Sequence, residues 1–162
     1  MAWAKNGTPV TLTSSGANMN VSDLSGLKFN EILSHTKRAT GTTYTTIYLN
    51  NDNSSGNYAR GQSENGGGRG TATSQNTVIY DMGGDDADKF EFTYIFGISS
   101  SEKLAIGFGI NAGTSESASA VPERGEFAWK WANTSDTIDR VDNQTGDGAY
   151  DTGSNLSALG TD

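Results

Sequence analysis

The stretch Lys89-Phe90-Glu91-Phe92-Thr93-Tyr94-Ile95-Phe96 places a large aromatic side chain at every second position. Successive side chains of a β-strand point to opposite faces, so this alternation is typical of a strand with one aromatic and one polar face. We expect the aromatic face to be buried and the polar face, which carries Glu91, to be solvated. The stretch therefore predicts a half-buried strand of an antiparallel sheet.

Two further runs support the same fold. In residues 104–110 large apolar side chains alternate with Ala and Gly, which predicts a face that a neighbouring element approaches closely. The polar link Ser99-Ser100-Ser101 before this run predicts an antiparallel hairpin with the first strand. Residues 127–131, Phe-Ala-Trp-Lys-Trp, repeat the alternation.

Weaker strand patterns occupy residues 10–13, 19–24, 27–35, 43–49, 58–63, 72–80, 138–141 and 155–159. Residues 25–38 also fit a helix, but their neighbours are dense in β-branched residues, which favours a strand. Many short strands separated by polar turns predict an all-β antiparallel sandwich of about 8–10 strands. We expect an N-terminal arm with the first strand in residues 1–20 and a single sandwich domain in residues 21–162.

Composition limits the partners. The chain has a net charge of −8, and its excess of acidic groups lies in residues 81–162, which carry fifteen acidic and five basic groups. An acidic chain repels phosphate backbones and anionic lipids, so we expect neither nucleic acid nor a membrane as a partner. The absence of cysteine excludes disulfides, thiolate metal sites and a cysteine nucleophile. The first seven residues lack a secretion signal, and no apolar run reaches membrane-spanning length.

Motifs for catalysis are missing from the sequence. His35 is the single histidine, and no nucleophile elbow, zinc-protease or phosphate-binding pattern occurs. Acid–base hydrolysis needs two carboxylates that face each other, and Glu91 and Glu126 are the sheet residues that offer one each. Both are expected on solvated faces, so we predict that the protein is not an enzyme.

The loop Asp81-Met82-Gly83-Gly84-Asp85-Asp86-Ala87-Asp88 concentrates four carboxylates. Hard oxygen ligands in a flexible glycine-containing loop suit Ca²⁺, although the spacing is not that of an EF-hand. Asp81, Asp85, Asp86 and Asp88 are therefore the candidate calcium ligands. No other cofactor is expected.

Tryptophan placement suggests where subunits meet. Trp129 and Trp131 share one strand face with Phe127, which favours either the core or a subunit interface. Trp3 and Val10 lie on the N-terminal arm, where they are expected to pack on a neighbouring subunit or on the edge of their own domain. A sugar-stacking platform is the alternative role for these tryptophans.

Several segments between Leu27 and Gly160 together resemble a broad group of small virion proteins of tailed phages, which are tail-associated or capsid-decorating jelly rolls. The segments are a strand from Phe29 to His35, Leu49-Asn50-Asn51-Asp52 followed by Asn57-Tyr58, Lys130-Trp131-Ala132-Asn133-Thr134-Ser135 before Ile138, and a closing Gly153-Ser154-x-Leu156 that ends at Leu159-Gly160. In the related proteins the last strand reads more like Leu-Tyr-Gly, whereas here it is Ala158-Leu159-Gly160.

The resemblance implies a jelly roll that works as a virion structural protein, in a capsid, tail or fibre. It implies partners in further copies of itself, with a homotrimer expected, and in other virion proteins; no catalytic or ligand-binding residue comes with it. The alternative is a carbohydrate-binding or host-recognition module, in which residues 50–57 and 81–88 form a shallow, calcium-assisted site for a surface glycan.

Overall fold

The computed structural model describes residues 2–40, 44–82, 88–113 and 118–162 of the 162-residue chain. These residues form antiparallel strands and no helix, which confirms the predicted all-β fold and leaves no helix able to cross a membrane among them. In chain order the strands are β1 (Ala4–Lys5), β2 (Val10–Thr11), β3 (Asn18–Val21), β4 (Phe29–Thr36), β5 (Arg38–Thr40), β6 (Thr45–Leu49), β7 (Tyr58–Glu64), β8 (Gly70–Gln75), β9 (Val78–Tyr80), β10 (Lys89–Phe96), β11 (Lys103–Asn111), β12 (Glu123–Trp131), β13 (Val141–Thr145), β14 (Ala149–Tyr150) and β15 (Asn155–Thr161).

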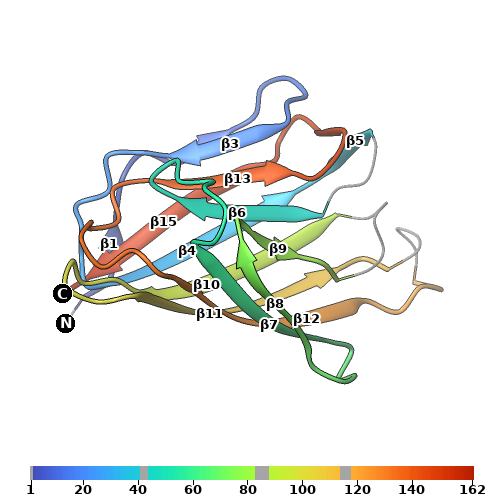
Figure 1. The fold of residues 1–162 in the computed structure, drawn as a ribbon. Coiled ribbons are helices and arrows are strands. Elements are labelled where there is room, and N and C mark those ends of the chain that lie inside the picture. The colour runs from blue at the N-terminus through green and yellow to red at the C-terminus, as the bar shows by residue number, and fades with distance from the viewer. Residues whose placement is uncertain (1, 41–43, 83–87, 114–117) are drawn as a thin grey trace.

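The strands stack as a sandwich of two main sheets (Figure 1). The larger sheet has the order β1-β15-β4-β10-β11-β12-β7-β8, with β2 also paired to β15, and the smaller has the order β3-β13-β6-β9. Strands β5 and β14 form a separate pair. This order is consistent with the expected jelly roll. Because β1 pairs with β15, the two termini lie side by side at one end of the molecule (Figure 1).

Most predicted strands are confirmed, with shifted ends. Strand β10 has the predicted bounds, and it pairs antiparallel with β11 across the serine link. Residues 25–38 contain strand β4 and no helix. The described chain has more strands than the expected 8–10, because several are only two or three residues long and because residues 72–80 divide between β8 and β9. The strand expected at residues 138–141 begins only at Val141.

The core lies between the two sheets and depends on glycine in β11. A Cβ atom at Gly107 would overlap the hydroxyl of Tyr80, and one at Gly109 would overlap the sulfur of Met82. Both of these bulky residues are fully buried. The close approach predicted from the Ala and Gly alternation is therefore confirmed: the glycines make room for side chains at the end of β9.

Polar side chains cross the core as hydrogen-bonded pairs. The hydroxyl of Tyr80 lies 2.8 Å from Thr93 Oγ1 and accepts a hydrogen bond of 2.7 Å from Trp129 Nε1. Tyr150 donates to Asn143 Oδ1 at 2.7 Å, and the Asn143 amide donates to Ser34 Oγ at 2.8 Å. Buried polar groups that are paired in this way fix the register of the two sheets, since an unpaired partner would cost free energy.

The prediction that the aromatic face of β10 is buried within this chain was wrong. Lys89, Glu91, Thr93 and Ile95 point into the sandwich, and the four aromatic residues point out of it. Tyr80 and Met82 fill the interior over the glycines of β11, and Trp129 and Trp131 of the neighbouring strand β12 fill the space beside them, whereas the inward positions of β10 hold its polar residues. An apolar sheet surface is left on the outside.

Candidate interaction surface

A stripe of apolar residues runs along the outer face of β10 and β11. The register of the hairpin places four pairs side by side: Phe90 with Ile110, Phe92 with Phe108, Tyr94 with Ile106, and Phe96 with Leu104. We call these eight residues the apolar stripe. Six of them, Phe90, Tyr94, Leu104, Ile106, Phe108 and Ile110, are between 39% and 53% exposed, and Phe92 and Phe96 are half-buried.

The rings of the stripe pack on one another along the sheet. The ring centres of Phe92 and Phe108 are 5.4 Å apart in a stacked arrangement, and the Phe92 and Tyr94 rings meet edge to face at 5.9 Å. The first pair joins β10 to β11 and the second lies along β10; ring contacts of both kinds restrict the side chains that make them.

Charged residues border the stripe on the two neighbouring strands. On β4, Glu31 is aligned with Tyr94, and His35 with Phe90. On β12, the outward residues are Arg124, Glu126, Ala128 and Lys130, aligned with the four stripe residues of β11. Glu31 raises the pKa of Tyr94 by hydrogen bonding to the phenol and by its negative charge. Lys130 forms a surface ion pair of 2.9 Å with Glu102.

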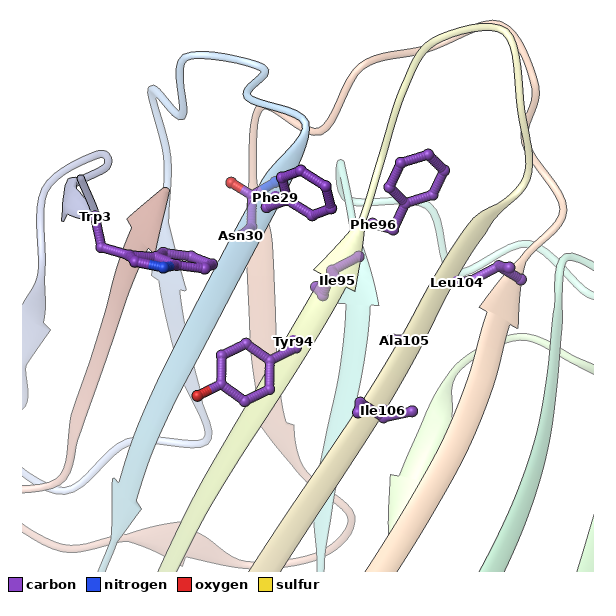
Figure 2. Close-up of a pocket in the computed structure, with 9 residues that line it drawn as sticks. All are labelled: Trp3, Phe29, Asn30, Tyr94, Ile95, Phe96, Leu104, Ala105 and Ile106. Atoms are coloured by element: carbon purple, nitrogen blue, oxygen red, sulfur yellow. The ribbon is translucent and has the colours of Figure 1, made fainter. Parts of the chain in front are cut away.

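A shallow hollow of about 250 Å³ lies at one end of the stripe, where the N-terminal arm reaches it (Figure 2). Its apolar lining comes from the arm, β4, β10 and β11: Trp3, Phe29, Tyr94, Phe96, Leu104 and Ile106. The Trp3 ring meets the Tyr94 ring edge-on at 6.1 Å and remains 44% exposed. The arm therefore extends the apolar surface beyond the two central strands.

The tryptophans and Val10 occupy different environments. Trp129 and Trp131 are buried between the sheets, so the structure places them in the core, one of the two predicted alternatives, and away from any surface where a second chain or a sugar could touch them. Val10 is half-buried against the edge of the core and pairs with Leu156 of β15. Among the predicted interface residues, Trp3 alone is exposed.

The predicted calcium loop is described only in part. Asp85 and Asp86 lie outside the described residues, so the proposed ligand set stays a prediction. Asp81 is exposed, and Asp88 lies with its Oδ2 atom 3.9 Å from Nε2 of His35. Over the described ranges, no three carboxylate or histidine side chains gather as a metal site would require.

The two sheet carboxylates do not face each other. Glu126 is exposed on the outer face of β12, whereas Glu91 is buried on the inner face of β10. The expectation that Glu91 is solvated was wrong. Burial raises the pKa of Glu91 to about 7, although the Thr45 hydroxyl and the charge of Lys89 oppose that rise. Opposite faces of one sheet cannot form a hydrolytic pair.

Comparison with protein-family models, with curated proteins and with solved structures finds no match to this chain. The resemblance to tailed-phage virion proteins therefore stays a prediction from the sequence.

Sequence reasoning did not identify Leu104, Ile106, Phe108 and Ile110 as surface residues. The available signal was the glycine and alanine alternation of β11 combined with the hairpin register. If the small side chains of β11 face the second sheet, then its large side chains and the aromatic residues aligned with them must face outward.

Proposed function

We propose that this chain is a structural subunit that works by assembling with further copies of itself and with other proteins of a particle. The observation that carries the proposal is the apolar stripe, an ordered surface of large side chains that a lone soluble domain seldom leaves in water. The resemblance to tailed-phage virion proteins supplies the kind of particle: a capsid, a tail or a fibre.

The solution mass tests the proposal. Light scattering after size separation, over a range of protein concentrations, is expected to give a mass above that of a single chain. Repeating the measurement with calcium and then with a chelator tests the predicted calcium loop in the same experiment. A single-chain mass at every concentration would contradict an assembly function.

A carbohydrate-binding module is the second candidate, and one observation favours it. The exposed rings of Trp3 and Tyr94 border a hollow, and aromatic rings are common sugar-stacking surfaces. The aliphatic half of the stripe argues for assembly instead, because Leu104, Ile106 and Ile110 offer no ring to a sugar. Binding to a glycan panel by a single-chain protein would support this candidate.

Trp3 is expected to contribute to assembly without supporting the fold. Replacing Trp3 by Ala removes an exposed ring at the end of the stripe, so we expect association to weaken about tenfold. The melting temperature at low protein concentration should change by only a degree or two, since surface substitutions usually alter stability by about 0.5 kcal/mol. Light scattering and thermal unfolding provide the two readouts.

Deleting the whole arm is a less specific test. Asn6 is buried, donates to Asn30 Oδ1 at 2.9 Å and accepts from the Ser25 backbone N–H at 2.8 Å. Removal of residues 1–9 would leave these groups without a partner and would destabilise the domain itself. If Trp3→Ala leaves the association constant unchanged, the Trp3 ring has no role in assembly.

A further inference from the structure

The outer face of the large sheet forms a regular array that is apolar in the middle and charged at its sides. Strands β4, β10, β11 and β12 are aligned in four rows, and each row crosses the apolar stripe. The margins are β4, whose outward residues are Phe29, Glu31, Leu33 and His35, and β12, whose outward residues are Arg124, Glu126, Ala128 and Lys130, so charged side chains alternate there with apolar ones. An array of this kind has the anatomy of a protein interface, with an apolar centre and a polar rim.

The exposed apolar area approaches what one partner of a stable dimer contributes. At roughly 200 Å² for a large apolar side chain, the six exposed stripe residues and Trp3 present on the order of 600 Å². The half-buried Phe92 and Phe96 and the margins add to this area. A standard interface takes about 800 Å² from each partner, so the array is large enough to be covered by one protein surface.

The charge of the array favours a second copy of the same chain as that surface. On the four strands, Glu31 and Glu126 contribute −2, and Arg124 and Lys130 contribute +2, so these positions have no formal net charge when His35 is neutral; Glu102, which is paired with Lys130 at the border, adds one negative charge. The whole chain has a net charge of −8, and its acidic excess therefore lies elsewhere. A nearly neutral face with both signs at its margins can approach its own copy with little electrostatic repulsion.

We propose that two copies of this chain pack their apolar stripes face to face around a two-fold axis. A single patch that binds itself is related by two-fold symmetry, whereas a ring of three copies needs two different patches. The inference rests on the proposed assembly function and specifies its partner. The resemblance described above implies a homotrimer. A two-fold interface instead gives an oligomer whose mass is an even multiple of 17.0 kDa.

A lysine in the middle of the stripe is the direct test. Ile106 is about half exposed, so Ile106→Lys should leave the fold intact, as far-UV circular dichroism and the melting temperature will show. Burial of two lysines in an apolar contact costs free energy, and at tenfold or more for each lysine we expect dimerisation to weaken about 100-fold. Because the added lysine makes the acidic chain less negative, electrostatic repulsion between two whole chains cannot explain weaker dimerisation.

The matched control is Asn20→Lys. Asn20 is exposed on β3, on the outer face of the smaller sheet, so this variant carries the same change in charge on the opposite side of the sandwich. It should dimerise like the native protein. Equal weakening by both variants would overturn the stripe as the interface.

Cross-linking keeps the proposal testable if Ile106→Lys fails to fold. Face-packed sheets lie about 10 Å apart, which is too far for a disulfide, so a short bismaleimide is suitable. The native chain has no cysteine, and Ile106→Cys therefore introduces one reactive site next to the predicted axis, where it should cross-link to its own copy. Asn20→Cys should not.

The outcomes separate the two proposals. If the native protein associates but neither Ile106 variant behaves as expected, the face-to-face dimer is wrong and the assembly function stands. If the native protein is a single chain at every concentration, both are wrong. An even-numbered oligomer that Ile106→Lys dissociates, while Asn20→Lys leaves it intact, supports both.

Discussion

Replacing Trp131 by Ala is expected to destabilise the domain by about 3–5 kcal/mol. Trp131 is fully buried, and its ring stacks on Tyr58 at 6.4 Å between ring centres. The Nζ atom of the buried Lys103 lies 5.5 Å from the centre of the same ring. Truncation would leave a cavity beside a buried cation and remove its aromatic neighbour. For a chain of this size, the melting temperature should fall by roughly 10 °C or more.

Trp131 also joins the sheet to a loop through Asp52. The Trp131 Nε1–H donates to Asp52 Oδ2 at 2.8 Å, and the same oxygen accepts from Asn57 Nδ2 at 2.7 Å. Burial favours the neutral acid, but hydrogen bonds from Trp131, Ser54 and Asn57 together outweigh it and lower the pKa of Asp52. Trp131→Phe keeps most of the ring and removes this donor, so we expect a smaller loss of about 1–3 kcal/mol.

Trp3→Ala is the matched control for Trp131→Ala, because it removes the same side chain from an exposed position. Urea unfolding of the three variants, measured below the concentration at which the chains associate, compares the two environments. A loss of stability as small for Trp131→Ala as for Trp3→Ala would contradict the placement of Trp131 in the core.

The strands themselves could be predicted because alternation is a local property. The period of two in residues 89–96 and the serine link after them determine a strand and a hairpin, whatever lies above or below the sheet. For residues 25–38, the β-branched residues around the segment favoured the strand that the structure contains.

Which face of a strand points inward could not be predicted in the same way. Period-two alternation distinguishes two faces, but the direction depends on the side chains of the opposite sheet. Tyr80 and Met82 fill the space above Gly107 and Gly109, so the interior has no room for a second layer of aromatic rings from β10. Lys89 and Glu91 are inside because the backbone pairing carries them there.

The error over the aromatic face also bears on the proposed interface. The alternation of β10 predicts a buried aromatic face, and face-to-face pairing of two chains would bury it. The aromatic face of β10 is exposed to water in the single chain, and it would be buried in the proposed dimer, as large apolar side chains favour. The outward residues of β11 were not predicted to lie on the surface, because they alternate with glycine and alanine, and that alternation indicates only that the inner face is closely approached.

Between pH 4.5 and about 8, the native protein is expected to lose stability that a Glu91→Gln variant keeps. Burial raises the pKa of Glu91 in the folded chain from 4.5 to about 7. In this interval the folded state holds a proton that the unfolded state has released, so the free energy of unfolding falls as the pH rises. The difference in pKa corresponds to roughly 3 kcal/mol, fully lost once the pH exceeds the folded value.

The surroundings of Glu91 explain why the charged form is disfavoured. Neither carboxylate oxygen has a hydrogen-bond partner of normal geometry among the described residues, and the Thr45 hydroxyl on the facing strand β6 lowers the pKa of Glu91 by less than burial raises it. The negative charge of Glu91 in turn raises the pKa values of Tyr80 and Tyr150, which are mainly raised by burial. Lys89, two residues away on the same inner face, offsets the burial of Glu91 only in part.

Urea unfolding at several pH values, at low protein concentration, measures this effect. Glu91→Gln should resemble the native protein near pH 4.5 and exceed its stability at pH 8, because the neutral amide has no proton to lose. Glu126→Gln, which makes the same chemical change at an exposed position on the outer face, is the matched control. The acid unfolding expected from Asp52 occurs at lower pH, since its pKa is lowered and not raised, so the two carboxylates act in separate intervals. If native and Glu91→Gln proteins show parallel pH profiles, Glu91 is not a buried acid of this kind, and the inward register of β10 has to be reconsidered.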